Sequence, residues 1–266
     1  MNQMKISRFP KLDYACNEAI NTLCTNLFYC GDDIRTVLFT SRYEQEGKSS
    51  IAMNVMRTLA GFGKRVVLID ADLRCSSLAR RYRFVFTHRE AVGLAQYLAG
   101  MGELEDAVYE TDLPNAYILP AGREVLSSLQ LLASPRYKEM METLKENFDV
   151  ILVDTPPAGV IVDALEIAKH CDGAILVVAC NKGRKQDIAE VVDSITQTGC
   201  KVLGAVMNGV NLKIHKGEVL GLAGLLGSGR TETAEMIFGA TRPAKGEITV
   251  KGKKVACIGS GPSSLT

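Results

Sequence analysis

Residues 44–50 read EQEGKSS and contain side chains that could bind a nucleotide's phosphates. Gly47, Lys48 and Ser49 match the end of the phosphate-loop pattern G-x-x-x-x-G-K-[ST], although Arg42 stands where the opening glycine belongs. In such loops, N–H groups at a helix start surround the phosphates, the lysine neutralises their charge and the serine hydroxyl binds Mg²⁺. The segment is either a phosphate loop or simply a helix start with Ser49 near the cap.

Carboxylates follow two apolar runs and supply the second part of a phosphate site. Asp154 ends DVILVD, and Asp70 ends RVVLID with Asp72 two residues later. An aspartate in this position holds Mg²⁺ in phosphate-loop proteins, although an acid there can also cap the next helix. Ligands bind at the carboxyl ends of the strands in open α/β folds. The loop and the acids together therefore predict a site for Mg²⁺ and a nucleoside triphosphate.

The elements that must position these residues are apolar runs alternating with amphipathic segments. The predicted strands are 36–41, 65–70, 116–121, 149–154, 173–179 and 201–208. Most are apolar throughout, which is typical of a parallel sheet covered on both faces. Residues 49–60 have helical periodicity and residues 12–30 also suggest a helix. We therefore predict a doubly wound, mostly parallel α/β domain at about residues 30–210.

Composition excludes several classes of protein. The net charge of the 266-residue chain is +1, and its basic residues lack interleaved aromatics, so we expect no nucleic-acid partner. The polar N-terminus predicts no signal peptide, and the apolar runs are shorter than a bilayer span. The eight cysteines follow no disulfide or zinc pattern, which favours a reducing, cytoplasmic compartment.

Three segments, in order, carry a resemblance to a known family. EGKSS, VVLIDADLR and VILVDTPP resemble the Walker A, A′ and B motifs of the bacterial tyrosine kinases that regulate capsular and exopolysaccharide synthesis. The resemblance extends over about residues 12–210 and includes LPAGR, LLASPR and VLGAVMNGV. It implies a sheet of the P-loop NTPase type and an ATP-dependent protein-tyrosine (auto)kinase.

Two alternatives to this function remain. One is a membrane-recruited ATPase switch of the partition or cell-division type, and the other is a catalytically impaired chimera. The partition and cell-division ATPases carry a second lysine where this chain has Tyr43, which favours the kinase.

The resemblance implies a role for each motif residue. Lys48 would hold the β- and γ-phosphates of ATP, while Ser49 and Asp154 would bind Mg²⁺. Asp70 and Asp72 would supply a further metal contact and the base that takes the acceptor's proton.

The remaining nucleotide contacts and the partners are also implied by the family. The contacts would come from Glu46, Gly47, Ser50 and Asn208, the last resembling the family's adenine-contacting asparagine or being a plain turn residue. Arg74 would have a structural or interface role. The partners would be a tyrosine-containing protein acceptor and a separate membrane activator whose cytoplasmic segment recruits the chain to the membrane's inner face. A homo-oligomer would also be consistent with the family.

The chain departs from the family pattern at three places. Glu44 and Gln45 replace the usual Pro-Gly of the loop, which predicts weakened nucleotide binding. The oligomerisation motif E-x-x-R-x-x-R lacks both arginines in residues 18–24, which puts ring assembly through that contact in doubt. The family's tyrosine-rich tail is absent, and the substitute acceptors considered are Tyr14, Tyr29 and Tyr137.

Residues after 210 resemble fragments of other proteins. Residues 211–254 resemble the start of a sugar-importer ABC ATPase domain, with Arg230 in place of the loop lysine. Residues 255–266 resemble the first turn of a flavin- or dinucleotide-binding fold. We therefore predict a kinase-like domain at 1–210 and a C-terminal α+β appendage, together a chimera whose two fragments have no activity of their own.

Overall fold

A computed structural model describes residues 2–31, 33–87, 91–125, 127–180 and 182–209. The strands and glycine loops predicted beyond residue 210 lie outside these ranges. Within them, residues 2–10 and 23–209 belong to one compact unit and residues 11–22 to another. All the strands belong to the larger unit.

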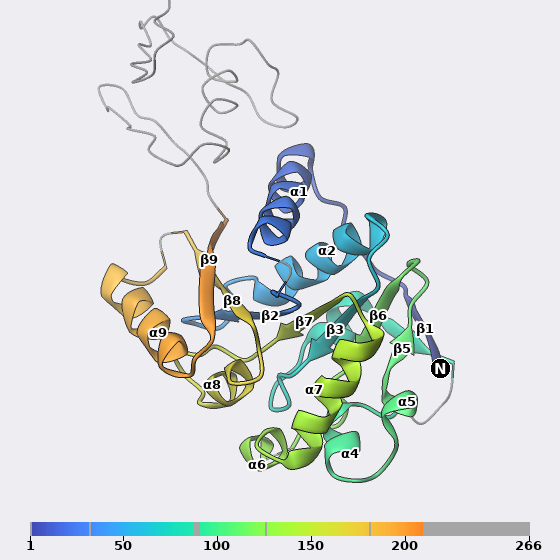
Figure 1. Cartoon of the computed structure of the whole chain (residues 1–266). Helices are drawn as coiled ribbons and strands as arrows, with labels where there is room; N and C mark the ends of the chain where they lie inside the picture. The colour runs from blue at the N-terminus through green and yellow to red at the C-terminus, as the bar shows by residue number, and fades with distance from the viewer. Residues whose placement is uncertain (1, 32, 88–90, 126, 181, 210–266) are drawn as a thin grey trace, which may run out of the picture. The chain divides into compact units, whose positions relative to one another are not determined.

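The larger unit is built on a sheet that has nine strands among the described residues, in the order β4-β1-β5-β6-β3-β7-β2-β8-β9 (Figure 1). The strands are β1 (Asn2–Ile6), β2 (Thr36–Ser41), β3 (Val66–Asp70), β4 (Phe84–Phe86), β5 (Tyr109–Glu110), β6 (Ala116–Leu119), β7 (Val150–Asp154), β8 (Gly173–Ala179) and β9 (Lys201–Asn208). Along the part of the sheet that runs β6-β3-β7-β2-β8-β9, each strand is parallel to its neighbours. The six predicted strands and the mostly parallel sheet are therefore confirmed.

The helices connect these strands. They are α1 (Tyr14–Tyr29), α2 (Lys48–Gly61), α3 (Leu78–Tyr82), α4 (Leu94–Leu98), α5 (Leu104–Ala107), α6 (Ser128–Leu132), α7 (Pro135–Asn147), α8 (Asp163–Ala168) and α9 (Lys185–Gln197). Both predicted helices are confirmed, as α1 and α2. In the described part of the chain, no helix is long and apolar enough to cross a membrane.

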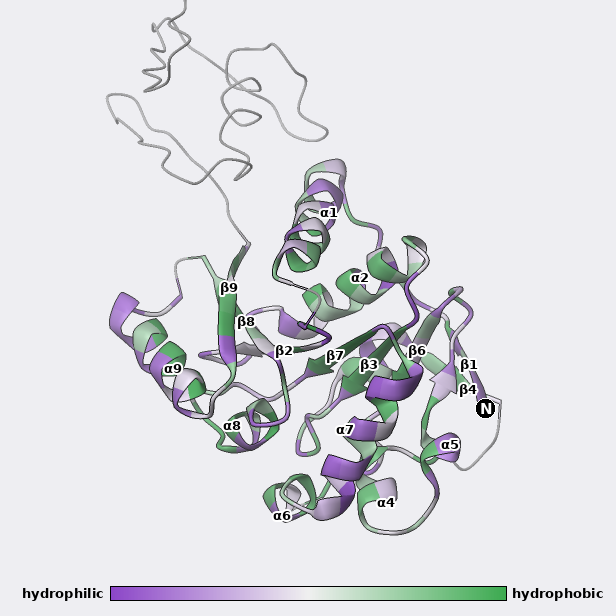
Figure 2. Ribbon diagram, in the orientation of Figure 1, coloured by the Kyte–Doolittle hydropathy of each residue, from purple (hydrophilic) through white to green (hydrophobic). Residues whose placement is uncertain are grey.

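The core lies against the central strands. Every residue of β2 and β3 is buried, and Figure 2 shows the central strands as hydrophobic. In Figure 1, α2 covers one face of the sheet and α7 and α8 cover the other. Full burial of one leucine-sized side chain contributes about 1.5–3 kcal/mol. This two-sided burial explains why these strands are apolar throughout.

The N-terminal strand β1 extends the sheet beyond residues 30–210, the span predicted for the alternating α/β elements, although the kinase-like domain is predicted at 1–210. β1 pairs antiparallel with β4 and parallel with β5, and buries Met4 and Ile6. Only two of its five side chains are buried. Such a short alternating segment gives too weak a signal to be recognised from sequence.

The order of the central strands positions the polar residues. β7 lies between β2, which precedes the EQEGKSS loop, and β3, which ends at Asp70. In the sheet register, Asp154 of β7 is opposite both Phe39 and Asp70. The loop and both strand-end acids therefore meet at one edge of the sheet.

Candidate functional site

The loop at residues 44–48 leads directly into α2. Gly47 precedes the helix with φ 95°, and a Cβ atom there would lie 2.1 Å from the Asn208 Nδ2 atom. Only glycine fits such a position without strain. The N–H group of Ile51 donates to the Gly47 carbonyl at 3.0 Å. The N–H groups of residues 48–50 thus have no acceptor within the helix and are directed outward, as anion binding requires.

Glu46 fixes the shape of this loop. Its carboxylate is buried and accepts hydrogen bonds from the Tyr43 N–H at 2.8 Å and the Ala179 N–H at 3.0 Å. The predicted nucleotide contact through Glu46 is therefore available only to its backbone, because its side chain attaches the loop to the end of β8.

The neighbouring residues attach the loop to the first turn of α9 and to the segment before it. The Tyr43 hydroxyl donates to Asp187 at 2.8 Å, and the Lys182 ammonium donates to the Glu44 carbonyl at 3.2 Å. Gln45, at the position of the family's glycine, has φ 59°. The conformation that glycine would favour is thus retained, at a cost of about 1–2 kcal/mol for a side chain in the left-handed region.

Asn208 lies beside this loop, as the resemblance requires. Its amide donates to the Glu46 carbonyl at 2.9 Å, and it is the last residue of β9. Because its side chain contacts a loop that is distant in the sequence, Asn208 does more than a plain turn residue would.

Asp70 and Asp154 form a buried pair of carboxylates. Burial, followed by the negative charge of Asp154, raises the pKa of Asp70 to about 8. Burial also raises the pKa of Asp154 to about 6, although the Lys48 ammonium and a hydrogen bond from Ser49 act in the opposite direction. The predicted loop residues Lys48 and Ser49 are thus brought to the predicted metal acid.

The same pair fits a divalent cation. The Oδ1 atoms of Asp70 and Asp154 are buried and have no hydrogen-bond partner. Buried polar atoms normally have partners, so a cation between loop and acids would satisfy both. No cluster of three His, Cys, Asp or Glu side chains suited to a metal occurs in the described ranges. Two carboxylates fit Mg²⁺, which usually takes one or two carboxylates together with phosphates and water.

Asp72 lies two residues after Asp70, beside a small cavity that both line. It accepts a hydrogen bond from the Cys75 N–H at 3.0 Å. The cavity has a volume of about 90 Å³, and its lining includes Asp70, Asp72, Ser76 and Glu124. All three predicted acids therefore lie at the same edge of the sheet.

Three contacts in this region escaped sequence reasoning. The Ser76 hydroxyl donates a short hydrogen bond to Asp70, and the Arg81 guanidinium donates to the Ser50 hydroxyl at 2.7 Å. Arg74 forms an ion pair with the buried Asp163 at 2.9 Å, which gives it the structural role considered above. Only the proximity of these residues to the DADLR motif could have drawn attention to them.

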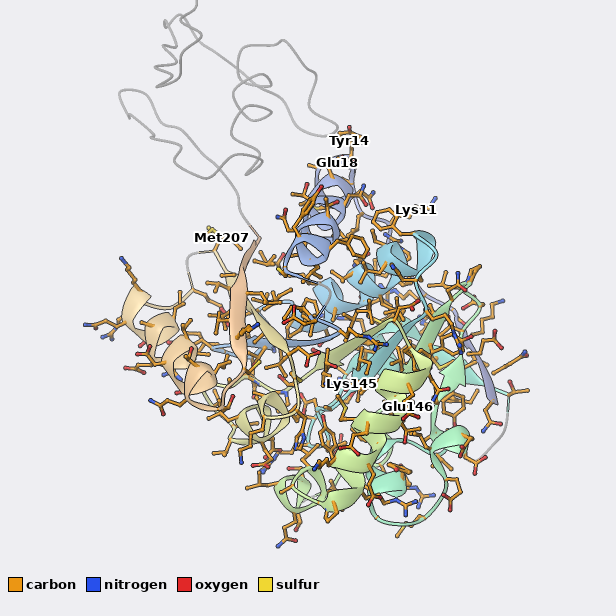
Figure 3. All side chains as sticks on the ribbon, in the orientation of Figure 1. Lys11, Tyr14, Glu18, Lys145, Glu146 and Met207 are labelled. Atoms are coloured by element: carbon orange, nitrogen blue, oxygen red, sulfur yellow. The ribbon has the colours of Figure 1, made fainter. Side chains whose placement is uncertain are left out.

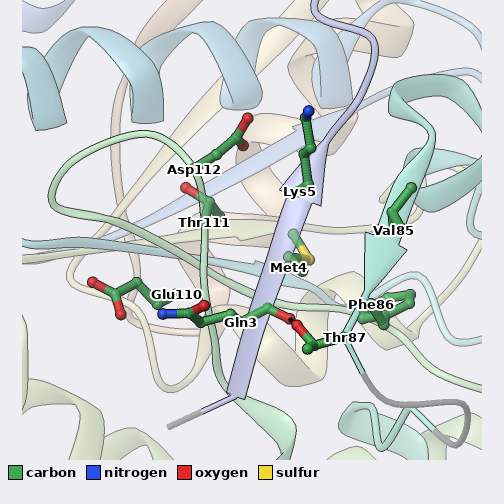
Figure 4. Close-up of a pocket in the computed structure, with 9 residues that line it drawn as sticks. All are labelled: Gln3, Met4, Lys5, Val85, Phe86, Thr87, Glu110, Thr111 and Asp112. Carbon is green, nitrogen blue, oxygen red and sulfur yellow. Dashed lines mark hydrogen bonds between the residues drawn. The ribbon is translucent and has the colours of Figure 1, made fainter.

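A larger groove lies elsewhere, on β1, β4 and β5. Figure 4 shows its lining, which includes Gln3, Lys5, Val85, Glu110 and Asp112, and its volume is about 620 Å³. Strands β6 and β3 separate these strands from β7. The groove contains none of the predicted site residues, so its size does not identify it as the nucleotide site.

Exposure separates the three tyrosines considered as acceptors. Tyr137 is fully buried, which excludes it from modification in the folded protein. Tyr14, labelled on α1 in Figure 3, is 69% exposed, and Tyr29 is 84% exposed.

Comparison with known proteins supports the same family. A family model described as an AAA domain matches residues 44–202, more than half of the chain. A model described as an ABC transporter matches residues 207–262, almost all of them outside the described residues.

Known relatives and structures cover the same region. Tyrosine-protein kinase CpsD of Streptococcus pneumoniae serotype 4 is 35% identical over 200 residues, which are 75% of this chain and 86% of the relative. The kinase domain of Escherichia coli tyrosine kinase ETK shares the fold, with a TM-score of 0.69, 23% identity and coverage of 77% of this chain and 80% of its own. The septum site-determining protein MinD of Pyrococcus horikoshii, complexed with Mg-ADP, has a TM-score of 0.56 and 28% identity, covering 65% and 70%. With the motifs assembled at one edge of a matching fold, the chain belongs to the bacterial tyrosine-protein kinases.

Proposed function

We propose that the chain is an ATP-dependent protein-tyrosine kinase that regulates capsular or exopolysaccharide synthesis. The observation that carries this proposal is the assembly of the EQEGKSS loop and the Asp70–Asp154 pair at one edge of the sheet. The kinase relatives support the reaction, and MinD with Mg-ADP supports the nucleotide and metal.

Each motif has a role in binding ATP. The free N–H groups at the start of α2 surround the phosphates, and Lys48 neutralises the charge of the β- and γ-phosphates. Ser49, Asp70 and Asp154 would hold Mg²⁺, which would supply positive charge to neutralise that developing on the transferred phosphoryl group. Asn208 supports the loop from β9, and the family resemblance supports its role as an adenine contact.

Transfer requires a base for the acceptor. Asp72 lines the small cavity next to the metal acids, where it can take the proton of a tyrosine hydroxyl as that oxygen attacks the γ-phosphate. The acceptor is a tyrosine-containing protein, which includes a second copy of this chain through Tyr14 or Tyr29. A separate membrane activator recruits the otherwise cytoplasmic chain to the inner face of the membrane.

The decisive experiment measures phosphotyrosine by intact mass after incubation with Mg·ATP and a tyrosine-rich peptide. Lys48→Met is the control, because it removes the phosphate-binding charge. We expect transfer by the natural sequence and none by the variant. ATP hydrolysis without transfer would instead indicate the switch ATPase, and the absence of binding, hydrolysis and transfer would indicate an impaired chimera.

We also propose that residues 211–254 are a truncated ABC-ATPase-like segment and 255–266 a truncated dinucleotide-fold-like segment. The ABC transporter model supports the first resemblance, and the resemblance of both segments to unrelated folds supports a chimera. Long-read sequencing of genomic DNA across the codons for residues 200–220 tests this. If the fusion is encoded in the genome, the reads should show one uninterrupted reading frame across the joint. If they show no such frame, the fusion arose outside the genome.

A further inference from the structure

Arg81 lies against the first turn of the helix that would bind the nucleotide. It belongs to the short helix α3, after the DADLR segment, and its guanidinium donates to the Ser50 hydroxyl oxygen at 2.7 Å. Ser50 follows Ser49 in the first turn of α2. A residue from a different part of the chain thus adds a positive charge at the place where α2 begins.

The bond to Arg81 directs the hydroxyl of Ser50. A hydroxyl group has one proton to donate and two lone pairs to accept with. Arg81 uses a lone pair, so the Ser50 proton can be donated to an acceptor at the helix start in place of the Tyr82 hydroxyl, with which the Ser50 side chain also interacts. A phosphate oxygen is such an acceptor, and the outward-directed N–H groups of residues 48–50 attract it to the same place.

The guanidinium itself can bind an anion there. Arginine has five N–H donors in a planar fork, which suits phosphate oxygens. Its positive charge also reaches the site electrostatically, because it opposes in small part the burial that raises the pKa of Asp154. The side chain is exposed at the surface of α3 and is not enclosed by the core.

We propose that Arg81 is a phosphate-binding residue of the nucleotide site, acting together with Ser50 on the polyphosphate of ATP or ADP. This inference rests on the proposed nucleotide site. It assigns a second basic side chain, besides Lys48, to the phosphates. Such a residue would offset part of the binding lost where Glu44 and Gln45 replace Pro-Gly.

The test compares Arg81→Gln with Arg80→Gln. Arg80 is the preceding residue of the same helix, is also exposed and has no contact with Ser50 among the described interactions. Both variants lose one positive charge, so their difference isolates the local contact from long-range attraction. Binding of Mg·ADP is measured by calorimetry, with adenosine as the ligand that lacks phosphate.

We expect Arg81→Gln to weaken Mg·ADP binding about 10-fold, the effect of one charge-assisted hydrogen bond. Arg80→Gln should change it less than about 2-fold, adenosine binding should not change, and Arg81→Lys should retain part of the affinity. The melting temperature without nucleotide should remain within about 2 °C, as for a surface substitution.

Three outcomes would overturn the inference. Unchanged ADP affinity in Arg81→Gln would leave Arg81 a purely structural contact of α3. Equal losses in both variants would show a general charge effect. If the natural sequence bound no Mg·ADP at all, the nucleotide site of the proposed function would fail as well.

Discussion

At the scale of single residues, the acid pair should make stability depend on pH in an unusual direction. The folded protein without metal keeps a proton on Asp70 up to about pH 8, whereas the unfolded chain loses it near the ordinary pKa of 3.8. The folded state therefore binds more protons between these values, and the free energy of unfolding falls as pH rises. Most carboxylates have a lowered pKa in the folded state, so they usually make the free energy of unfolding rise with pH.

Asp70→Asn should remove this penalty. We expect the variant without metal to melt roughly 5–10 °C above the natural sequence at pH 8.5, and much closer to it at pH 5. The measurement is thermal unfolding in EDTA across this range, with Asp72→Asn, whose charge makes a smaller contribution to the same pKa, as the comparison that should show a smaller effect. A stabilisation that was the same at every pH would contradict the assigned protonation.

Gln45 offers a second test at this scale. Its φ of 59° favours glycine, so Gln45→Gly should stabilise the protein by about 1 kcal/mol or less and tighten Mg·ADP binding. Gln45→Ala, which keeps the Cβ atom, should give neither gain. Chemical denaturation and calorimetry measure the two effects, and equal results for both variants would exclude backbone strain as the reason.

At the scale of elements, the phosphate loop depends on β8 through one side chain. The Glu46 carboxylate accepts two hydrogen bonds, from the backbone N–H groups of Tyr43 and Ala179. In Glu46→Gln, the amide nitrogen would face one of these donors and leave it without an acceptor, which costs about 1–3 kcal/mol.

We therefore expect Glu46→Gln to lower the melting temperature by roughly 3–8 °C and to weaken Mg·ADP binding. Glu44→Gln is the matched control, because Glu44 is exposed and only its carbonyl takes part in a described hydrogen bond. Differential scanning calorimetry with and without Mg·ADP would show both effects. Equal behaviour of the two variants would mean that the Glu46 carboxylate does not hold the loop.

At the scale of the whole molecule, the structure predicts where the nucleotide-binding domain can end. The strands that the described residues contribute to the sheet lie between Asn2 and Asn208. A fragment of residues 1–209 should therefore melt within about 3 °C of the full chain and bind Mg·ADP equally well.

A fragment of residues 1–200 is the informative comparison. It lacks β9, which leaves β8 as an unpaired edge, and it lacks the Asn208 contact to the loop. We expect it to aggregate or to lose nucleotide binding, as measured by size-exclusion chromatography and calorimetry. Instability of the longer fragment would show that residues after 209 are required for the fold.

The sequence alone identified the features that depend on local pattern. Five of the six predicted strands could be recognised because burial makes them apolar throughout, and the sixth, the edge strand β9, because it is an apolar run although none of its residues is buried. Asp70 and Asp154 could be recognised because each ends such a strand, and Lys48 and Ser49 because they open a helix after the short loop that follows one. The order of the motifs was sufficient to indicate the family.

The tertiary structure decided which of these residues meet. Local periodicity does not reveal that β7 lies between β2 and β3, and this placement is what brings Asp154 beside Asp70. The contacts of Asn208 with Glu46, and of Arg81 with Ser50, join segments that are distant in sequence. Such pairings arise from the packing of the whole sheet and its helices, so they become visible only when the chain is folded.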